Sequence, residues 1–274
     1  MPCDVVGKIG SMAMIRRDEN DIDYNILSRV ANELRPGMIW VTSGAAEVGR
    51  LDYMKRTGCE LTGDPETIKA DYAAQGQAIL MANYRQFAHP EYSLRQVLVE
   101  HQHFNDEVKR EYIRRLLLRA TQQKAIPIVN YNDPVSDVEI RKLELNSYRR
   151  QHGGHAVECV DNDETAAVIC KLMQAKYLVI LTSTEGIYRD PTDPSTLVQN
   201  VVCPDAESLV REVRTLQESC IGASRAGANG ARAKLEFALD PALSGATVII
   251  GSAKYRLSEL LNGQAPQTRI GIKR

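Results

Sequence analysis

Two carboxylates and an amide stand together where a helix is expected to begin. Asp161, Asn162 and Asp163 lead into residues 165–170, which are small or apolar and continue with helical spacing. Acidic and amide side chains at such a position can hold a polar substrate and order the charged groups around a phosphate. The simplest alternative for Asp161 is a helix cap.

Two lysines offer the positive charge that a phosphate needs. Lys8 is followed closely by Gly10, so an ammonium group and bare backbone N–H groups can approach a phosphate together. A surface lysine is the alternative, since the P-loop spacing is missing. Lys234 lies about one turn inside a helix after the glycine-bearing segment 227–230. It either reaches back to phosphate oxygens at the helix start or lies on a solvated helix face.

A small-residue turn supplies a further candidate anion site. Ser43-Gly44-Ala45 follows one apolar run and precedes a helix. The N–H groups at the start of that helix would face an anion. Alternatively, Ser43 is a plain helix cap.

The candidate residues follow predicted strands. Apolar runs predict strands at 5–9, 38–42, 94–99, 125–130, 177–182, 198–202 and 246–251, with a short helix and a last strand in 254–274. Helices are expected over 22–34, 70–87, 105–123, 161–174, 205–213 and 230–238, whereas 131–160 is polar and turn-rich. This alternation predicts an α/β fold, a three-layer sandwich with a mainly parallel central sheet covered by helices on both faces. Ligands of such sheets bind beyond the carboxyl ends of the strands.

The composition excludes several classes of protein. A net charge of −1 provides no general attraction to nucleic acid or to an anionic membrane. No apolar run approaches the roughly 18 residues that span a bilayer, and the first residues lack the layout of a signal peptide. The six cysteines form no CxxC pair, and we expect them to be reduced. The expectation is a cytoplasmic protein with neither nucleic acid nor membrane as partner.

In their order along the chain, these segments resemble the amino acid kinase family, and within it the glutamate 5-kinases. The N-terminal matches are Val6-Gly7-Lys8-Ile9-Gly10, Val41-Thr42-Ser43-Gly44-Ala45-Ala46, Ala74-Gln75-Gly76-Gln77 with Leu80-Met81, and Gln96-Val97-Leu98. The later matches are Ile126-Pro127-Ile128-Val129-Asn130 with Asn132-Asp133, Asp161-Asn162-Asp163, Leu181-Thr182 with Gly186-Ile187-Tyr188, and Lys234-Leu235. The resemblance spans nearly the whole chain.

The resemblance implies transfer of the γ-phosphoryl group of ATP to a small carboxylate, giving an acyl phosphate, with Mg²⁺ carried by the nucleotide. It implies a single kinase domain over 1–274, with an acceptor-binding part over about 1–175 and a nucleotide-binding part over about 176–274. No appended C-terminal domain of the RNA-binding type is expected. The family's habit of forming oligomers implies a homo-oligomer, with 73–87 either as the contact face or as a core face.

The resemblance also assigns roles. Lys8 and Lys234 would stabilise the transferring phosphoryl group, and Asp163 would organise both lysines. The acceptor would be held by Ser43, Gly44, Asn130, Asn132, Asp133 and Asn162, with the aspartate suiting an ammonium and the Asn162 amide a carboxylate. The nucleotide would be bound by Lys8, Gly10, Ser11, Thr182, Ser183, Gly186, Tyr188, Asn229, Gly230 and Lys234. No metal site made by the protein itself is expected.

Three positions depart from the family pattern. Tyr131 stands where these kinases usually have glutamate, which changes the charge beside the expected acceptor site. Ser183 replaces an aspartate, and 229–231 reads Asn-Gly-Ala where the family has Gly-Gly-Met. The contacts to the acceptor and to ATP are therefore less secure than the lysines.

The largest departure is the longer segment 141–160. It carries charged and metal-binding side chains, namely Arg141, Arg149, Arg150, His152 and His155. A more anionic acceptor, an effector or a partner chain would use that charge, and a solvated hairpin is the alternative. His152, His155, Glu158 and Cys159 are spaced like metal ligands, but no second pair completes a zinc site.

Two alternatives to a carboxylate kinase follow. The chain is either a kinase of the same fold that acts on a phosphate, a phosphonate or a nucleoside monophosphate, or a non-catalytic protein that binds nucleotides or oxyanions.

Overall fold

The computed structural model describes residues 3–16, 18–153, 156–159, 161–220 and 230–273. Its strands are β1 (Val5–Ile9), β2 (Ile15–Arg16), β3 (Asp21–Ile22), β4 (Met38–Thr42), β5 (Ser93–Val99), β6 (Ala125–Tyr131), β7 (Tyr177–Thr182), β8 (Asn200–Cys203), β9 (Thr247–Ser252) and β10 (Gln267–Ile272). Its α-helices are α1 (Tyr24–Glu33), α2 (Ala45–Thr57), α3 (Pro65–Phe87), α4 (Gln102–Asn105), α5 (Glu107–Gln122), α6 (Val138–His152), α7 (Asn162–Met173), α8 (Ala206–Ser219), α9 (Ala231–Leu243) and α10 (Leu257–Leu261). Three short 3₁₀ helices are η1 (Ser11–Ala13), η2 (Asp133–Val135) and η3 (Pro194–Thr196).

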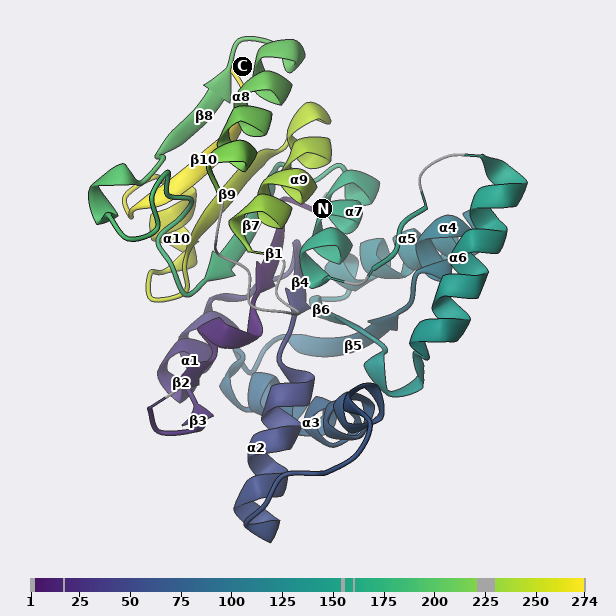
Figure 1. Ribbon diagram of the computed structural model, residues 1–274. Coiled ribbons are helices and arrows are strands. Elements are labelled where there is room, and N and C mark those ends of the chain that lie inside the picture. Colours follow the sequence, from purple (N-terminus) through teal and green to yellow (C-terminus); the bar gives the residue numbers. More distant parts are fainter. Residues whose placement is uncertain (1–2, 17, 154–155, 160, 221–229, 274) are drawn as a thin grey trace.

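One eight-stranded sheet runs through the molecule in the order β5-β6-β4-β1-β7-β9-β10-β8 (Figure 1). Every neighbouring pair from β5 to β9 is parallel, β10 is antiparallel to β9, and β8 is parallel to β10. Strands β2 and β3 form a separate antiparallel pair. The mainly parallel sheet that the sequence predicts is confirmed.

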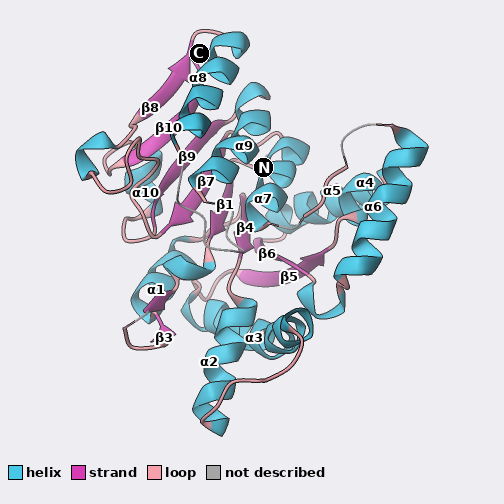
Figure 2. Cartoon of the chain, in the orientation of Figure 1, coloured by secondary structure: helices cyan, strands magenta, loops and turns pink. Residues whose placement is uncertain are grey.

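Helices cover both faces of this sheet (Figure 2). Alternate residues of each strand point to opposite faces. In β4, Ile39 and Val41 join the core under α5, α7, α8 and α9, whereas Met38 and Trp40 join the core under α1, α2, α3 and α10. The result is the three-layer sandwich expected from the apolar strands.

The first strand places Lys8 on the α7 face. Val6 belongs to the core on that face, and Lys8, two residues later, points the same way. On the other face, Gly7 lies beneath the Trp40 ring, because a Cβ on Gly7 would come within 2.0 Å of Trp40 Cζ3. The glycine therefore lets an indole cover β1, while the lysine faces α7.

The segment 131–160 is the clearest correction to the sequence-based prediction. It is neither turn-rich throughout nor a hairpin, because α6 occupies half of it. Asp137 caps this helix by accepting from Ile140 N at 2.8 Å, and Leu145 is its only fully buried residue. Because so little of the helix faces the core, its sequence has no apolar stripe from which a helix could be predicted.

Other differences are local. Helix α3 begins at Pro65 behind the cap Asp64, five residues before the predicted start at 70. The predicted helix 105–123 is divided at Asp106, whose side chain accepts from Lys109 N at 2.8 Å and begins α5. In the described part of the chain, no helix is long and apolar enough to cross a membrane.

Candidate active site

A buried carboxylate lies between two lysines at the carboxyl end of the parallel strands. Lys8 Nζ is 2.6 Å from Asp163 Oδ1, and Lys234 Nζ is 3.0 Å from Asp163 Oδ2. Asp163 is fully buried and Lys8 is 5% exposed, while the Lys234 side chain is 21% exposed. The three groups come from β1, α7 and α9 and carry a net charge of about +1, which suits an anion.

The electrostatics keep Asp163 ionised. Burial alone would raise its pKa, but the ammonium groups of Lys8 and Lys234 hold the pKa below its ordinary value. The neighbouring Asp161 behaves differently, because burial and the charge of Asp163 raise its pKa. Asp161 caps α7 by accepting from Asp163 N at 2.9 Å, which is the role of a helix cap.

Asn162 joins three elements above the strand ends. Its Nδ2 donates to Thr42 O at 3.2 Å, to Ser43 Oγ at 3.1 Å and to Asn130 Oδ1 at 2.9 Å. Asn130 in turn donates to Gln77 Oε1 of α3 at 2.8 Å. Three of the predicted acceptor residues, Ser43, Asn130 and Asn162, are thus brought into one partly buried network.

Gly44 and Gly10 of the site serve different structural purposes. Gly44 caps α2 with a φ of 100°, a conformation that favours glycine. Gly10 lies beside the first lysine, because a Cβ at this position would be 3.7 Å from Lys8 Nζ. Its own N–H donates to Leu181 O and that of Ser43 to Ile9 O, both at 3.1 Å, so neither is the bare N–H group that the sequence suggested. Ser11, also predicted to bind nucleotide, opens η1 directly after Gly10.

The predicted acceptor residues Asn132 and Asp133 have other partners. Asn132 Nδ2 donates to Glu100 Oε1 at 2.9 Å. Asp133 Oδ1 lies 2.9 Å from Lys69 Nζ of α3. The carboxylate expected to receive an ammonium is therefore already paired in this structure.

The predicted nucleotide loop follows β7. Thr182 Oγ1 donates to Thr184 O and accepts from Thr184 N, each at 2.9 Å, while Ser183 is exposed. Gly186 is tightly enclosed, because a Cβ there would lie 2.6 Å from Thr268 Oγ1. Tyr188 ends the loop in a bridge to Leu197.

The turn before Lys234 is only partly described. Gly230 caps α9, and Lys234 N donates to Gly230 O at 3.3 Å. Asn229 lies outside the described residues. His155, one member of the metal-like spacing, also lies outside them, and the described residues contain no group of three or more His, Cys, Asp and Glu that could hold a metal.

Helix α6 packs beside the sheet edge on the α5 face. The Arg141 guanidinium lies 5.8 Å from the centre of the Tyr131 ring, and Tyr131 belongs to the core on that face. Asn130, its neighbour, points to Gln77 on the other face. The Tyr131 departure therefore changes packing under α6 and does not place an aromatic ring against the amide network.

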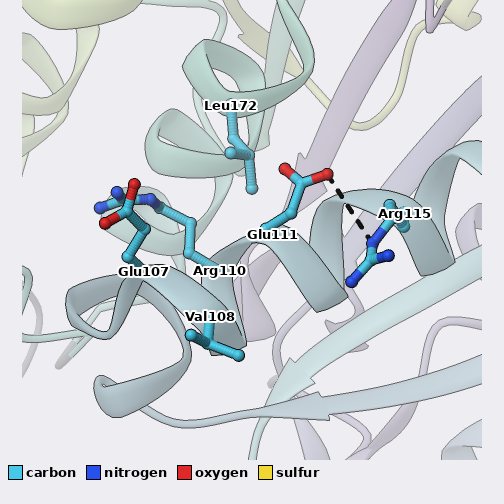
Figure 3. A pocket seen from close by; sticks show the side chains of 6 residues that line it. All are labelled: Glu107, Val108, Arg110, Glu111, Arg115 and Leu172. Atoms are coloured by element: carbon cyan, nitrogen blue, oxygen red, sulfur yellow. Dashed lines mark ion pairs between the residues drawn. The ribbon is translucent and has the colours of Figure 1, made fainter.

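An open depression elsewhere on the surface has no part in this arrangement. It is lined by Glu107, Val108, Arg110, Glu111, Arg115 and Leu172 (Figure 3). The figure shows the ion pair between Glu111 and Arg115, whose atoms are 3.7 Å apart. Leu172 is ten residues along α7 from Asn162, which corresponds to about 15 Å at 1.5 Å per residue.

Comparison with known proteins shows the family to which the chain belongs. A sequence model of the amino acid kinase family matches residues 5–252. The chain belongs to the amino acid kinase family. This confirms the resemblance read from the sequence motifs.

Two curated relatives in this family are glutamate 5-kinases. That of Gloeobacter violaceus is 30% identical over 285 residues, covering 98% of this chain and 69% of the relative. That of Geobacillus thermodenitrificans is 31% identical over 284 residues, covering 98% and 67%. The chain thus spans about two thirds of the length of these relatives.

Solved structures of amino acid kinase type share the fold. Carbamate kinase from Giardia lamblia bound to AMP-PNP has a TM-score of 0.60 at 14% identity, with 99% of both chains covered. UMP kinase from Ureaplasma parvum has a TM-score of 0.55 at 8% identity, with 100% of both chains covered. At these identities the likeness shows the fold alone.

Sequence reasoning missed Gln77 as a residue of the candidate site. The segment 74–77 matched the family pattern, but no role was given to its last residue. Gln77 is 7% exposed and bonded to Asn130. The available signal in the sequence was its place directly after Gly76 in a segment that matches the family.

Proposed function

We propose that this chain is an ATP-dependent kinase that transfers the γ-phosphoryl group to the carboxylate of a small amino acid, with glutamate as the acceptor, and so forms an acyl phosphate. The observation that carries the proposal is the buried Asp163 flanked at 2.6 and 3.0 Å by Lys8 and Lys234. The glutamate 5-kinase relatives support the choice of acceptor.

The lysines would do most of the chemical work. An oxygen of the acceptor carboxylate attacks the γ-phosphorus, the bond from that phosphorus to the β–γ bridging oxygen breaks, and ADP leaves with the electron pair. Such a transfer needs positioning and charge neutralisation more than covalent catalysis. Lys8 is held rigidly in β1, whereas the more exposed Lys234 can follow the phosphoryl group. Asp163 keeps both ammonium groups at the transfer point.

The protein groups around this point fit a magnesium ion that is carried by the nucleotide. Asp163 is engaged by two ammonium groups, and Asp161 accepts from the backbone of α7. Both carboxylates already have partners, so phosphate oxygens and water would supply most of the coordination. Bound in this way, the ion would neutralise phosphate charge.

The remaining predicted residues divide between two substrates. Ser43, Gly44, Asn130 and Asn162 would hold the acceptor, and the loop 182–188 with the start of α9 would hold the nucleotide. The division at about residue 175 and the formation of a homo-oligomer remain predictions. In the structure, Leu80 and Tyr84 of α3 are fully buried, so this stripe of the helix serves the core.

A coupled ADP-release assay with glutamate tests the proposal, with hydroxylamine added to trap the acyl phosphate as a hydroxamate. We expect glutamate-dependent ADP release that is lost in Lys8→Ala and in Lys234→Ala. Lys171→Ala is the matched control, because Lys171 pairs with Asp240 on the exposed surface. Nucleotide binding without turnover on any acceptor, including nucleoside monophosphates and phosphonates, would identify a binding protein instead.

A further inference from the structure

One backbone N–H group orients the buried amides of the site. Tyr131 N donates to Asn130 Oδ1 at 2.9 Å, and only the oxygen of an amide can accept. Asn130 Nδ2 must then be the donor to Gln77 Oε1 at 2.8 Å. Asn130 Oδ1 also accepts from Asn162 Nδ2 at 2.9 Å. The polarity of Asn130 and Gln77 therefore follows from one strand N–H, and that of Asn162 agrees with it because Nδ2 also donates to Thr42 O.

This orientation leaves two buried atoms without a hydrogen-bond partner among the described residues, Gln77 Nε2 and Asn162 Oδ1. Asn162 Nδ2 is already shared by Thr42 O, Ser43 Oγ and Asn130 Oδ1. The available atom of Asn162 is thus an acceptor, and unpaired buried acceptors are rare in folded proteins. A ligand that satisfies it must bring an N–H or O–H donor.

Gln77 is held in place by close packing of its helix. A Cβ on the preceding Gly76 would lie 1.8 Å from Ala45 O and 2.4 Å from Gly49 N. A Cβ on Gly49 would lie 1.8 Å from Tyr72 O. The backbones of α2 and α3 are therefore in contact where α2 begins, next to Ser43. This packing leaves Gln77 little freedom relative to Asn130.

We propose that Gln77 is a positioning residue that keeps the carbonyl oxygen of Asn162 turned toward the acceptor, so that the site selects acceptors that carry an ammonium group. The inference rests on the proposed function and extends it to the basis of acceptor choice. It reverses the role that the sequence suggested for Asn162, because the free atom receives a donor and not a carboxylate. Asp133, the residue that the sequence suggested for an ammonium, is paired with Lys69.

Gln77 acts through Asn130, whose amide has an anchor at each end. The Tyr131 N–H holds its oxygen, and Gln77 Oε1 holds its nitrogen. In Gln77→Met, a side chain of similar length lacks the acceptor, and the Asn130 nitrogen stays unpaired unless the amide turns over. Turning it would set Nδ2 against the Tyr131 N–H, so we expect Asn130 to keep its oxygen anchor, to lose its nitrogen anchor and to hold Asn162 Nδ2 less firmly. Gln77→Glu keeps an oxygen for Asn130 and preserves the arrangement.

The experiment compares glutamate with glutarate, which lacks only the ammonium, by kcat/KM at saturating ATP and Mg²⁺. We expect the wild-type enzyme to prefer glutamate by at least tenfold, as for a hydrogen bond to a charged group. Gln77→Met should reduce the preference to about threefold or less, mainly through the KM for glutamate, and leave the KM for ATP unchanged. Gln77→Glu should keep it. Gln267→Met is the matched control, because Gln267 is 5% exposed in β10 and should leave the preference unaltered.

Each outcome separates this inference from the proposed function. Absence of glutamate-dependent ADP release in the wild-type enzyme refutes the proposed function. A wild-type enzyme that turns over both acceptors equally, or a Gln77→Met enzyme that keeps the wild-type preference, refutes the role of Gln77 alone. Loss of the preference in Gln77→Glu refutes it as well, and this result is readable even where Gln77→Met fails to fold.

Discussion

Replacing Asp163 by asparagine removes one charge and almost no volume, so it isolates the electrostatic role of this residue. The two lysine contacts at 2.6 and 3.0 Å each correspond to about 6 kcal/mol of Coulomb energy at an effective dielectric constant of about 20. Desolvation of the buried carboxylate offsets much of this. Removing one partner from a buried ion pair costs about 3–5 kcal/mol in practice.

The transition state should bear a large part of that cost. Without Asp163, the ammonium groups of Lys8 and Lys234 repel each other and leave the transfer point. A loss of about 3 kcal/mol at the transition state lowers kcat by more than about 100-fold, because 1.4 kcal/mol is a factor of ten. Affinity for ATP should change much less, since the phosphates can still attract both lysines.

The assay is steady-state ADP release with glutamate, combined with ATP titration and thermal unfolding of each variant. Asp240→Asn is the control, because it breaks a lysine–aspartate pair whose side chains are 57% and 70% exposed. It should change neither kcat nor the free energy of unfolding appreciably. A folded Asp163→Asn enzyme with kcat within about threefold of wild type would refute the idea that the carboxylate organises the lysines.

Three further outcomes are expected. Gly76→Ala should lower the free energy of unfolding by about 3 kcal/mol or more, because its Cβ would lie 1.8 Å from the Ala45 carbonyl oxygen. Gly271→Ala is the control and should not lower it, because the nearest atom to a Cβ there is 3.6 Å away. Urea unfolding of both variants checks this prediction. Burial holds the pKa of His101 below its ordinary value, so the unfolded state binds the proton first, and stability should fall as pH drops below about 6.5. Thermal unfolding between pH 7 and 5 should show a smaller decline in His101→Asn, and an equal decline would contradict the assignment. Arg141→Ala should leave the ratio of glutamate to glutarate turnover unchanged, because Arg141 packs on Tyr131 on the sheet face opposite the Asn130 side chain. An altered ratio would show that α6 contributes to acceptor binding.

The strands were predictable because a strand buried on both faces is a continuous run of apolar residues. Val5–Ile9, Met38–Thr42 and Tyr177–Thr182 have the same limits in the structure as in the prediction, since each is a compact apolar run between polar turns. Helix α6 was not predictable in this way. It makes few core contacts, so its stability depends on its cap and on helix-forming residues. Neither produces the regular spacing of apolar residues from which a helix is predicted.

The positions of the charged residues of the candidate site were predictable from the sequence, whereas the hydrogen bonds of its amide side chains were not. Lys8 lies near the carboxyl end of a strand, and Asp163 and Lys234 lie in the first turns of helices. Their convergence beyond the strand ends could therefore be expected. Hydrogen-bond direction could not, because it depends on which atom of each amide meets Tyr131 N and Gln77. The pairing of Asp133 with Lys69 was equally inaccessible, since 64 residues separate the two in sequence.

The strand order explains why the lysines come from opposite halves of the chain. All of β5, β6, β4 and β1 precede residue 132, and all of β7, β9, β10 and β8 follow residue 176. Lys8 is on β1, the strand of the first group that borders the second group in the sheet. Strand β1 pairs directly with β7 of the second group. The order of strands reverses at β1, and such a switch point opens a crevice at the carboxyl ends.

Asp163 is the group that joins the two halves at this crevice. It lies in the first turn of α7, the helix that connects the two sets of strands, and it touches a lysine from each. A carboxylate in either half alone would hold one ammonium group, and the other would be free to leave. In the proposed reaction, the charge of Asp163 would hold both ammonium groups where an acceptor bound by one half meets a nucleotide bound by the other.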